Sequence, residues 1–169
     1  MTIAAHVENT GESTLRGVAL SDGRRLRYAA HWMPIIATAE NYSIALEDMR
    51  AVVKVWKRPD IDAATGAQRA AELVAHVRAL TVDRARSVLM DLNAAPPVAG
   101  PKTSEVLADL LRTCERAGVP VAFVYGADAV QALQCRRLVA EHAPKHGRAV
   151  RDLAEAEAFL GTRGPLSRT

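Results

Sequence analysis

The side chains whose types and spacing could bind a metal ion or a cation occur in pairs, and neither pair has a third ligand. Asp60 and Asp62 follow a proline and could hold a cation, but paired aspartates in a strand-to-helix connection usually make turns and helix caps. His142 and His146 have the i,i+4 spacing of a metal pair, yet Pro144 interrupts any helix that would place both rings on one face. We therefore expect no metal site.

Nucleophilic and nucleotide-binding patterns are equally sparse. Cys114 falls on the apolar side of a helical pattern, where burial raises the pKa of a thiol and makes it a poor nucleophile. Gly126-Ala127-Asp128 lies between a predicted strand and a predicted helix, as phosphate loops do, but one glycine is far from a dinucleotide or P-loop motif. No Gly-x-Ser-x-Gly element is present. We expect no catalytic residues and no cofactor, and we predict that the chain is not an enzyme.

A strand-to-helix junction is the place where a small α/β domain usually keeps its working residues. Here an apolar strand at 87–92 leads into a loop rich in alanine and proline at 93–101. Asp91 is the only acidic residue between Asp83 and Glu105, and no Ser, Cys or His occupies the tip of the loop. This pattern favours a binding or regulatory module over an enzyme.

Composition limits the class of protein. With 169 residues, 49% of them hydrophobic, the chain can bury one core but not two ordinary domains. The aromatic content of 4% does not favour a large ligand pocket, and the net charge of +3 comes from scattered side chains, so nucleic-acid binding is not indicated. No segment has the length and apolar character of a membrane span, no leader pattern opens the chain, and Cys114 and Cys135 are isolated. We expect a cytoplasmic protein without membrane insertion.

Hydrophobic periodicity divides the chain into an amino-terminal extension at 1–41, an α/β domain at 42–160 and a tail at 161–169. In the extension, the turn signal Asp22-Gly23 predicts a hairpin over residues 13–30, and the content of Gly, Ser and charged residues leaves a partly disordered segment as the alternative. In the domain, the apolar patterns predict strands at 42–46, 51–57, 87–92, 119–125 and 146–150, and helices at 65–80, 102–117, 127–143 and 152–160.

This order of elements resembles the STAS domain, the fold of bacterial anti-sigma factor antagonists and of the cytoplasmic part of sulfate transporters. The segments that carry the resemblance are Val52–Asp62, Val88–Leu92, Gly118–Gly126 and Glu157–Leu160. The resemblance implies an α/β fold with a small mixed sheet of four to five strands packed with about four helices. It also implies a role in bacterial signalling.

The chain departs from this family at the start of its second predicted helix. Regulated STAS domains carry an Asp-Ser-Ser/Thr-Gly-like segment there, and an anti-sigma kinase phosphorylates one of its hydroxyls. The corresponding residues here, Val98–Lys102, contain no hydroxyl. Thr103 and Ser104 follow directly and are the candidates for phosphorylation, because the positive end of a helix favours a phosphate. The alternative is that one of them caps or decorates the helix.

The first hypothesis for function is a protein-interaction domain that binds its partner through the loop before this helix. The predicted partner-binding residues are Asn93, Pro97, Val98, Ala99, Gly100 and Lys102. Three prolines stiffen the segment 93–101, so docking would cost less conformational entropy. The resemblance implies that the partner is an anti-sigma factor, a kinase-like protein or a larger signalling assembly.

Two other functions stay open. In one, a small ligand or a substrate binds near the carboxyl ends of the central strands, beside Asp91, Asn93 and Tyr125. In the other, the chain forms a homo-oligomer through an apolar segment near its amino terminus, which contains Trp32, Met33, Ile35 and Ile36.

Overall fold

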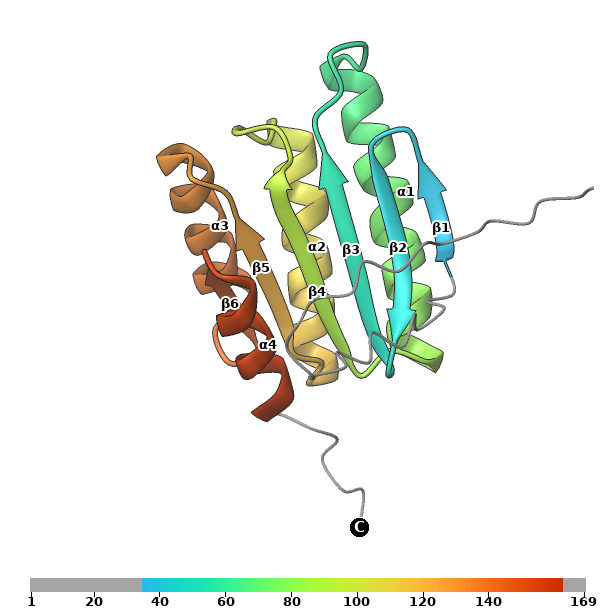
Figure 1. Cartoon of the computed structure of the whole chain (residues 1–169), viewed down its shortest axis with the longest axis vertical. Helices are drawn as coiled ribbons and strands as arrows, with labels where there is room; N and C mark the ends of the chain where they lie inside the picture. The colour runs from blue at the N-terminus through green and yellow to red at the C-terminus, as the bar shows by residue number, and fades with distance from the viewer. Residues whose placement is uncertain (1–34, 163–169) are drawn as a thin grey trace, which may run out of the picture. The chain divides into compact units, whose positions relative to one another are not determined.

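The computed structural model describes residues 35–162, which form one mixed β-sheet flanked by helices (Figure 1). The predicted hairpin at 13–30, the residues Trp32 and Met33, and the tail beyond residue 162 lie outside the described residues. The strands are β1 (Ile35–Ala39), β2 (Tyr42–Glu47), β3 (Arg50–Trp56), β4 (Ser87–Ala94), β5 (Val121–Tyr125) and β6 (Gly147–Val150). The helices are α1 (Ala63–Asp83), α2 (Pro101–Ala117), α3 (Ala129–His142) and α4 (Leu153–Thr162). None of these helices is long and apolar enough to cross a membrane.

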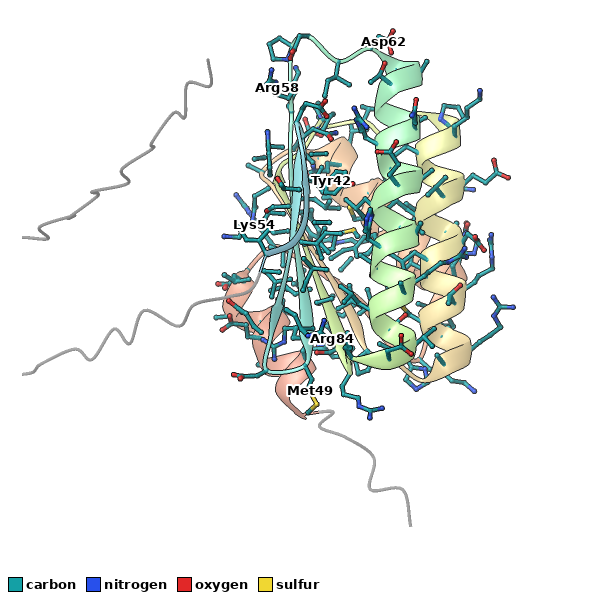
Figure 2. The ribbon with its side chains drawn as sticks, turned by 90° about the vertical axis from the view of Figure 1, so that its right-hand side faces the viewer. Tyr42, Met49, Lys54, Arg58, Asp62 and Arg84 are labelled. Carbon is teal, nitrogen blue, oxygen red and sulfur yellow. The ribbon has the colours of Figure 1, made fainter. Side chains whose placement is uncertain are left out.

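The strands stand in the sheet in the same order as in the chain, from β1 to β6. β1, β2 and β3 are antiparallel neighbours, whereas β3, β4, β5 and β6 are parallel. A tight turn cannot join parallel neighbours, so α1, α2 and α3 form the three crossover connections. Crossovers are right-handed, and all three step in the same direction, so these helices cover one face of the sheet. Figure 2 shows α1 and α2 on the same side.

The two faces of the sheet bury different side chains because residues alternate along each strand. Met90 and Phe123 are fully buried in the core beneath α1, α2 and α3. Leu89 and Val124 face the other way, where α4 packs across β4, β5 and β6 with Leu160 in contact. The fold is therefore a three-layer arrangement over β4–β6.

A two-residue turn at Asp48 and Met49 joins β2 to β3, since Glu47 pairs with Arg50. Both turn residues have positive φ angles, 43° and 63°. This left-handed conformation matches the twist of a hairpin, and aspartate adopts it more readily than methionine. Strand pairing, rather than a glycine in the turn, therefore sets this register.

The α/β fold class is confirmed, with two corrections of detail. The sheet of the described residues has six strands rather than four to five, because Ile35–Ala39 pairs with β2 inside the segment assigned to an extension. α4 continues past Gly161 to Thr162. Gly161 keeps a helical backbone, whereas Gly118 ends α2 by turning left-handed, with a φ of 66°.

Gly147 begins β6 after the connection from α3 at residues 143–146, at a position with no space for a side chain. A Cβ there would lie 2.6 Å from the Ala143 carbonyl oxygen and 2.8 Å from Val139 Cγ1. We expect Gly147→Ala to lower the free energy of unfolding by about 2 kcal/mol in urea titrations, because overpacking displaces the neighbouring backbone. The control is Gly161→Ala, where a Cβ would meet nothing within 4 Å and should not destabilise the protein. Equal unfolding midpoints for the parent and G147A would contradict this expectation.

Candidate functional site

The loop at residues 95–100 lies at the edge of the sheet where the parallel strands end. It connects β4 to α2. The β3–α1 connection at 57–62 and the β5–α3 connection at 126–128 reach the same edge, because β3, β4 and β5 run parallel. Open α/β sheets commonly bind their ligands at this edge.

A buried glutamine of α3 holds the first part of this loop. The residue Gln131 is 5% exposed, and its Nε2 atom donates to the Leu92 carbonyl oxygen at 2.9 Å and to the Pro96 carbonyl oxygen at 3.4 Å. Its Oε1 atom accepts from the Gly126 backbone N–H at 2.7 Å. A Cβ on Gly126 would lie only 3.0 Å from the Asn93 carbonyl oxygen and 3.3 Å from Gln131 Oε1, so glycine permits this close approach.

A second glutamine and a serine hold the far end of the loop. Gln134 Oε1 accepts from the Ala99 backbone N–H at 3.1 Å. In α2, the Ser104 backbone N–H donates to the Gly100 carbonyl oxygen at 2.9 Å, and the Ser104 hydroxyl donates to the Ala99 carbonyl oxygen at 3.4 Å. Contacts from α2 and α3 therefore fix the conformation of the loop.

The residues predicted to bind a partner lie on this loop and at its two ends. Val98 is 54% exposed at the tip. Ala99 is half-buried, in keeping with the hydrogen bond of its N–H to Gln134. The other four are exposed, namely Asn93, Pro97, Gly100 and Lys102.

Two apolar side chains of α3, the helix that holds the loop, are exposed. Val130 is 50% exposed and Leu133 is 69% exposed. Val130 lies one helical turn before Gln134 on the same face of α3, and Gln134 contacts Ala99 of the loop. Leu133 is three residues after Val130 and is its neighbour on the helix surface, turned about 100° from Gln134. We group these two residues with Val98 as what we call the apolar patch, three of the seven large apolar side chains exposed among the described residues. Val130 and Leu133 are not among the predicted residues, although apolar residues outside the buried stripe of α3 were a usable signal.

Thr103 and Ser104, the candidates for phosphorylation, are half-buried in the first turn of α2. The N-cap is Gly100, which has no side chain to cap the helix, and Pro101 opens the first turn. Neither hydroxyl is therefore the helix cap. Ser104 instead bonds to the loop, so phosphorylation there would require the loss of this bond.

Of the residues predicted for a small-ligand site, Asp91 and Asn93 lie together, whereas Tyr125 faces the other side of the sheet. Asp91 alternates with Leu92, which faces α1–α3, so its carboxylate lies on the other face. Asp91 Oδ1 accepts from the Asn93 backbone N–H at 3.0 Å and from Asn93 Nδ2 at 2.8 Å. Tyr125 is buried on the helix-covered face, where its hydroxyl accepts from Arg136 Nε at 3.0 Å and from Arg136 Nη2 at 2.6 Å.

The aspartates of the strand-to-helix connections make turns and caps, as their positions predicted. Two hydrogen bonds from Arg58, at 2.8 and 2.7 Å, lower the pKa of Asp60 to about 2. Asp62 caps α1 by accepting from the Thr65 N–H at 2.7 Å, which also lowers the pKa of Asp62. Figure 2 shows Arg58 and Asp62 at the same end of the sheet. Asp128 caps α3 in the same way.

Both thiols are buried, in agreement with their isolated positions in the sequence. Burial raises the pKa of Cys114 to about 12 and that of Cys135 to about 11. Within residues 35–162, no group of three or more His, Cys, Asp or Glu side chains could hold a metal ion.

His146 lies beside a carboxylate. Its Nδ1 atom is 3.3 Å from Glu115 Oε2, and the same carboxylate accepts from the backbone N–H groups of His146 at 2.9 Å and Lys145 at 3.3 Å. Burial alone would raise the pKa of Glu115, but these hydrogen bonds outweigh burial, and the pKa lies below its ordinary value. Glu115 thereby fastens the α3–β6 connection to α2.

The inner side of the loop forms one wall of a cavity of about 700 Å³. The other walls come from the carboxyl ends of β3 and β4 and from α1, α2 and α3. The low aromatic content did not favour a large ligand pocket, and the structure nevertheless has a cavity of this volume. Small residues on α1, namely Gly66, Ala67 and Ala70, line this space together with the aromatic residues Tyr42 and Trp56.

Comparison of the chain with protein-family models, with curated proteins and with solved structures found no match. The resemblance to STAS domains therefore stays a prediction from the sequence segments that carry it.

We expect Gln131→Leu to lower the free energy of unfolding by about 2 kcal/mol, because Leu92, Pro96 and Gly126 would each lose a hydrogen bond. Hydrogen exchange at the Gly126 amide should accelerate, since this N–H loses its acceptor. The control is Gln68→Leu at an exposed position of α1. Unchanged exchange at Gly126 in Q131L would show that Gln131 does not hold the loop.

Glu115 should make stability depend on pH. Because its pKa is lower in the folded state, its stabilisation is complete above the unfolded-state pKa of about 4.3 and is lost as the pH falls through the folded-state pKa. We expect Glu115→Gln to cost about 1–2 kcal/mol at pH 5 and progressively less towards pH 3. Urea unfolding across this range measures the difference. Glu105→Gln, at an exposed position on the same helix, is the control. A pH-independent deficit in E115Q would contradict the assignment.

Proposed function

We propose that this chain is a non-catalytic, STAS-like regulatory domain that binds a signalling protein through the apolar patch of Val98, Val130 and Leu133. The resemblance in sequence suggests an anti-sigma factor or a kinase-like protein as the partner. The other predicted loop residues would form the rim of this surface, and Lys102 would give the rim a positive charge.

The observation that carries the proposal is the occurrence of exposed apolar side chains both on the loop and on α3, the helix that is hydrogen-bonded to it. Three of the seven large apolar side chains exposed among the described residues belong to the patch. Isolated exposed apolar residues are common on protein surfaces, but a group of them rimmed by polar residues is typical of interaction sites. Here the group combines a loop with a helix, which widens the surface beyond the loop alone.

The rigidity of the loop supports the same proposal. Gln131 and Gln134 hold its backbone through hydrogen bonds from α3. Pro96 and Pro97 restrict its backbone further. A surface that is already ordered loses little conformational entropy on docking, so more of its contact energy appears as affinity.

Capture from a lysate of the source organism tests this proposal. The tagged parent chain identifies the bound protein by mass spectrometry, and quantitative binding of that protein is then measured for Val98→Asp and Leu133→Asp. We expect each substitution to weaken binding by about tenfold or more, because a carboxylate would be desolvated at the centre of the contact.

The control is Val82→Asp, which introduces the same carboxylate at an exposed residue of the last turn of α1. This turn precedes β4, so it lies at the opposite edge of the sheet from the loop. Equal binding by V98D, L133D and V82D would rule out the apolar patch as the docking surface.

A further inference from the structure

The cavity behind the loop has an apolar interior. Side chains from the sheet and from all three helices on this face contribute to it, including Leu73, Met90, Leu92, Leu107 and Leu138. Its volume of about 700 Å³ falls within the range of about 300–1,000 Å³ that small-molecule sites occupy. Exposed residues among its lining, such as Ala64 and Pro101, place its mouth at the molecular surface.

The order of side-chain sizes along α1 explains why the space lies at this end of the sheet. Ala67 and Ala70 line the cavity, whereas Val77 and Leu80 further along the helix are buried and fill the core. The second half of α1 is also fastened to α2, because Arg78 forms an ion pair with Asp109. α1 and α2 are therefore joined by an ion pair along the second half of α1, and the small residues of its first half leave the cavity open.

Some of the charged residues that line the cavity form ion pairs, and others do not. Arg58 forms an ion pair with Asp60, and Arg69 forms ion pairs with Glu40 and Glu72. In residues 35–162, by contrast, no ion pair or side-chain hydrogen bond occupies Lys57 or Lys102, both exposed lining residues. The one carboxylate of the lining, Asp62, already accepts from the N–H of Thr65. The mouth of an apolar cavity therefore carries unpaired positive charge.

Lys102 has a second reason to attract an anion. It lies in the first turn of α2, at the positive end of the helix. The N-cap is a glycine, so no side-chain oxygen satisfies the free N–H groups of this turn. A carboxylate at the mouth would meet the lysine charge and this helix end together.

We propose that the cavity binds a small amphipathic carboxylate, with its hydrocarbon body among the leucine side chains and its carboxylate at Lys57 and Lys102. The apolar lining fits an alkyl or aryl body and does not fit a nucleotide, whose sugar and phosphates need many polar partners. This proposal goes beyond the docking of a protein and does not depend on it.

Isothermal titration of the whole chain with octanoate and with octan-1-ol tests the proposal, because the two probes share a hydrocarbon body and differ in charge. We expect saturable binding of both, with octanoate tighter by about fivefold. Trp56 lines the cavity, so its fluorescence should change in the same titrations.

Two matched pairs of variants locate the site. Ala70→Phe would fill the cavity and should abolish binding, whereas Ala71→Phe, at the exposed neighbouring residue, should preserve it. Lys102→Glu should weaken octanoate by about fivefold or more and leave octan-1-ol unchanged. Lys54→Glu makes the same charge change on the face of the sheet away from α1 and α2 (Figure 2), and it should bind both probes like the parent.

Circular dichroism establishes that A70F is folded before its binding is interpreted. If A70F does not fold, the K102E and K54E pair decides, since both positions are exposed. The proposal is overturned if neither probe binds the parent, if octanoate binds K102E and K54E equally, or if a folded A70F binds as tightly as A71F.

Discussion

The carboxyl edge of the sheet depends on one buried amide, that of Gln131. It pairs with main-chain groups of Leu92, Pro96 and Gly126, which belong to the end of β4, the following loop and the β5–α3 connection. Main-chain groups that leave a strand ladder at a buried edge cost free energy unless another partner replaces the ladder. Because a single side chain supplies three such bonds, the position of α3 and the conformation of the loop are coupled. A movement of either α3 or the loop would break the hydrogen bonds that join them.

The same loop has two working surfaces. Val98 exposes its side chain to solvent as part of the apolar patch and also lines the cavity. A protein on the outer surface and a small molecule on the inner surface would thus contact one backbone segment. Such an arrangement produces coupling between the two sites only if the loop has a second conformation that one of them prefers. The contacts from Gln131, Gln134 and Ser104 stabilise the conformation seen here, so they set how easily the loop departs from it.

The sequence predicted what depends on local patterns and missed what depends on tertiary context. β4 and β5 were predicted because their apolar runs are short and continuous, and β3 because its β-branched residues follow a period of two. α2 was predicted because its apolar stripe ends at Gly118. β1 was not predicted as a strand of the sheet, since it is an edge strand whose pairing depends on β2. Asp91 and Tyr125 were grouped because neighbouring parallel strands end together, but the face on which each side chain lies depends on register. The loop was predicted from its position, whereas the role of Gln131 was hidden because a polar residue on a buried helix face reads as an exposed one.

The match between strand order in space and strand order in the chain has a consequence for assembly during synthesis. Each new strand adds to the free edge of the strands already made, and none has to insert between two that are paired. The contacts formed at each step join segments that are close in the chain, which keeps the entropy of loop closure small. α4 comes last and covers β4, β5 and β6 on their second face. The growing chain can therefore add one strand and its helix at a time as it leaves the ribosome. α4 then covers the exposed face of the last three strands.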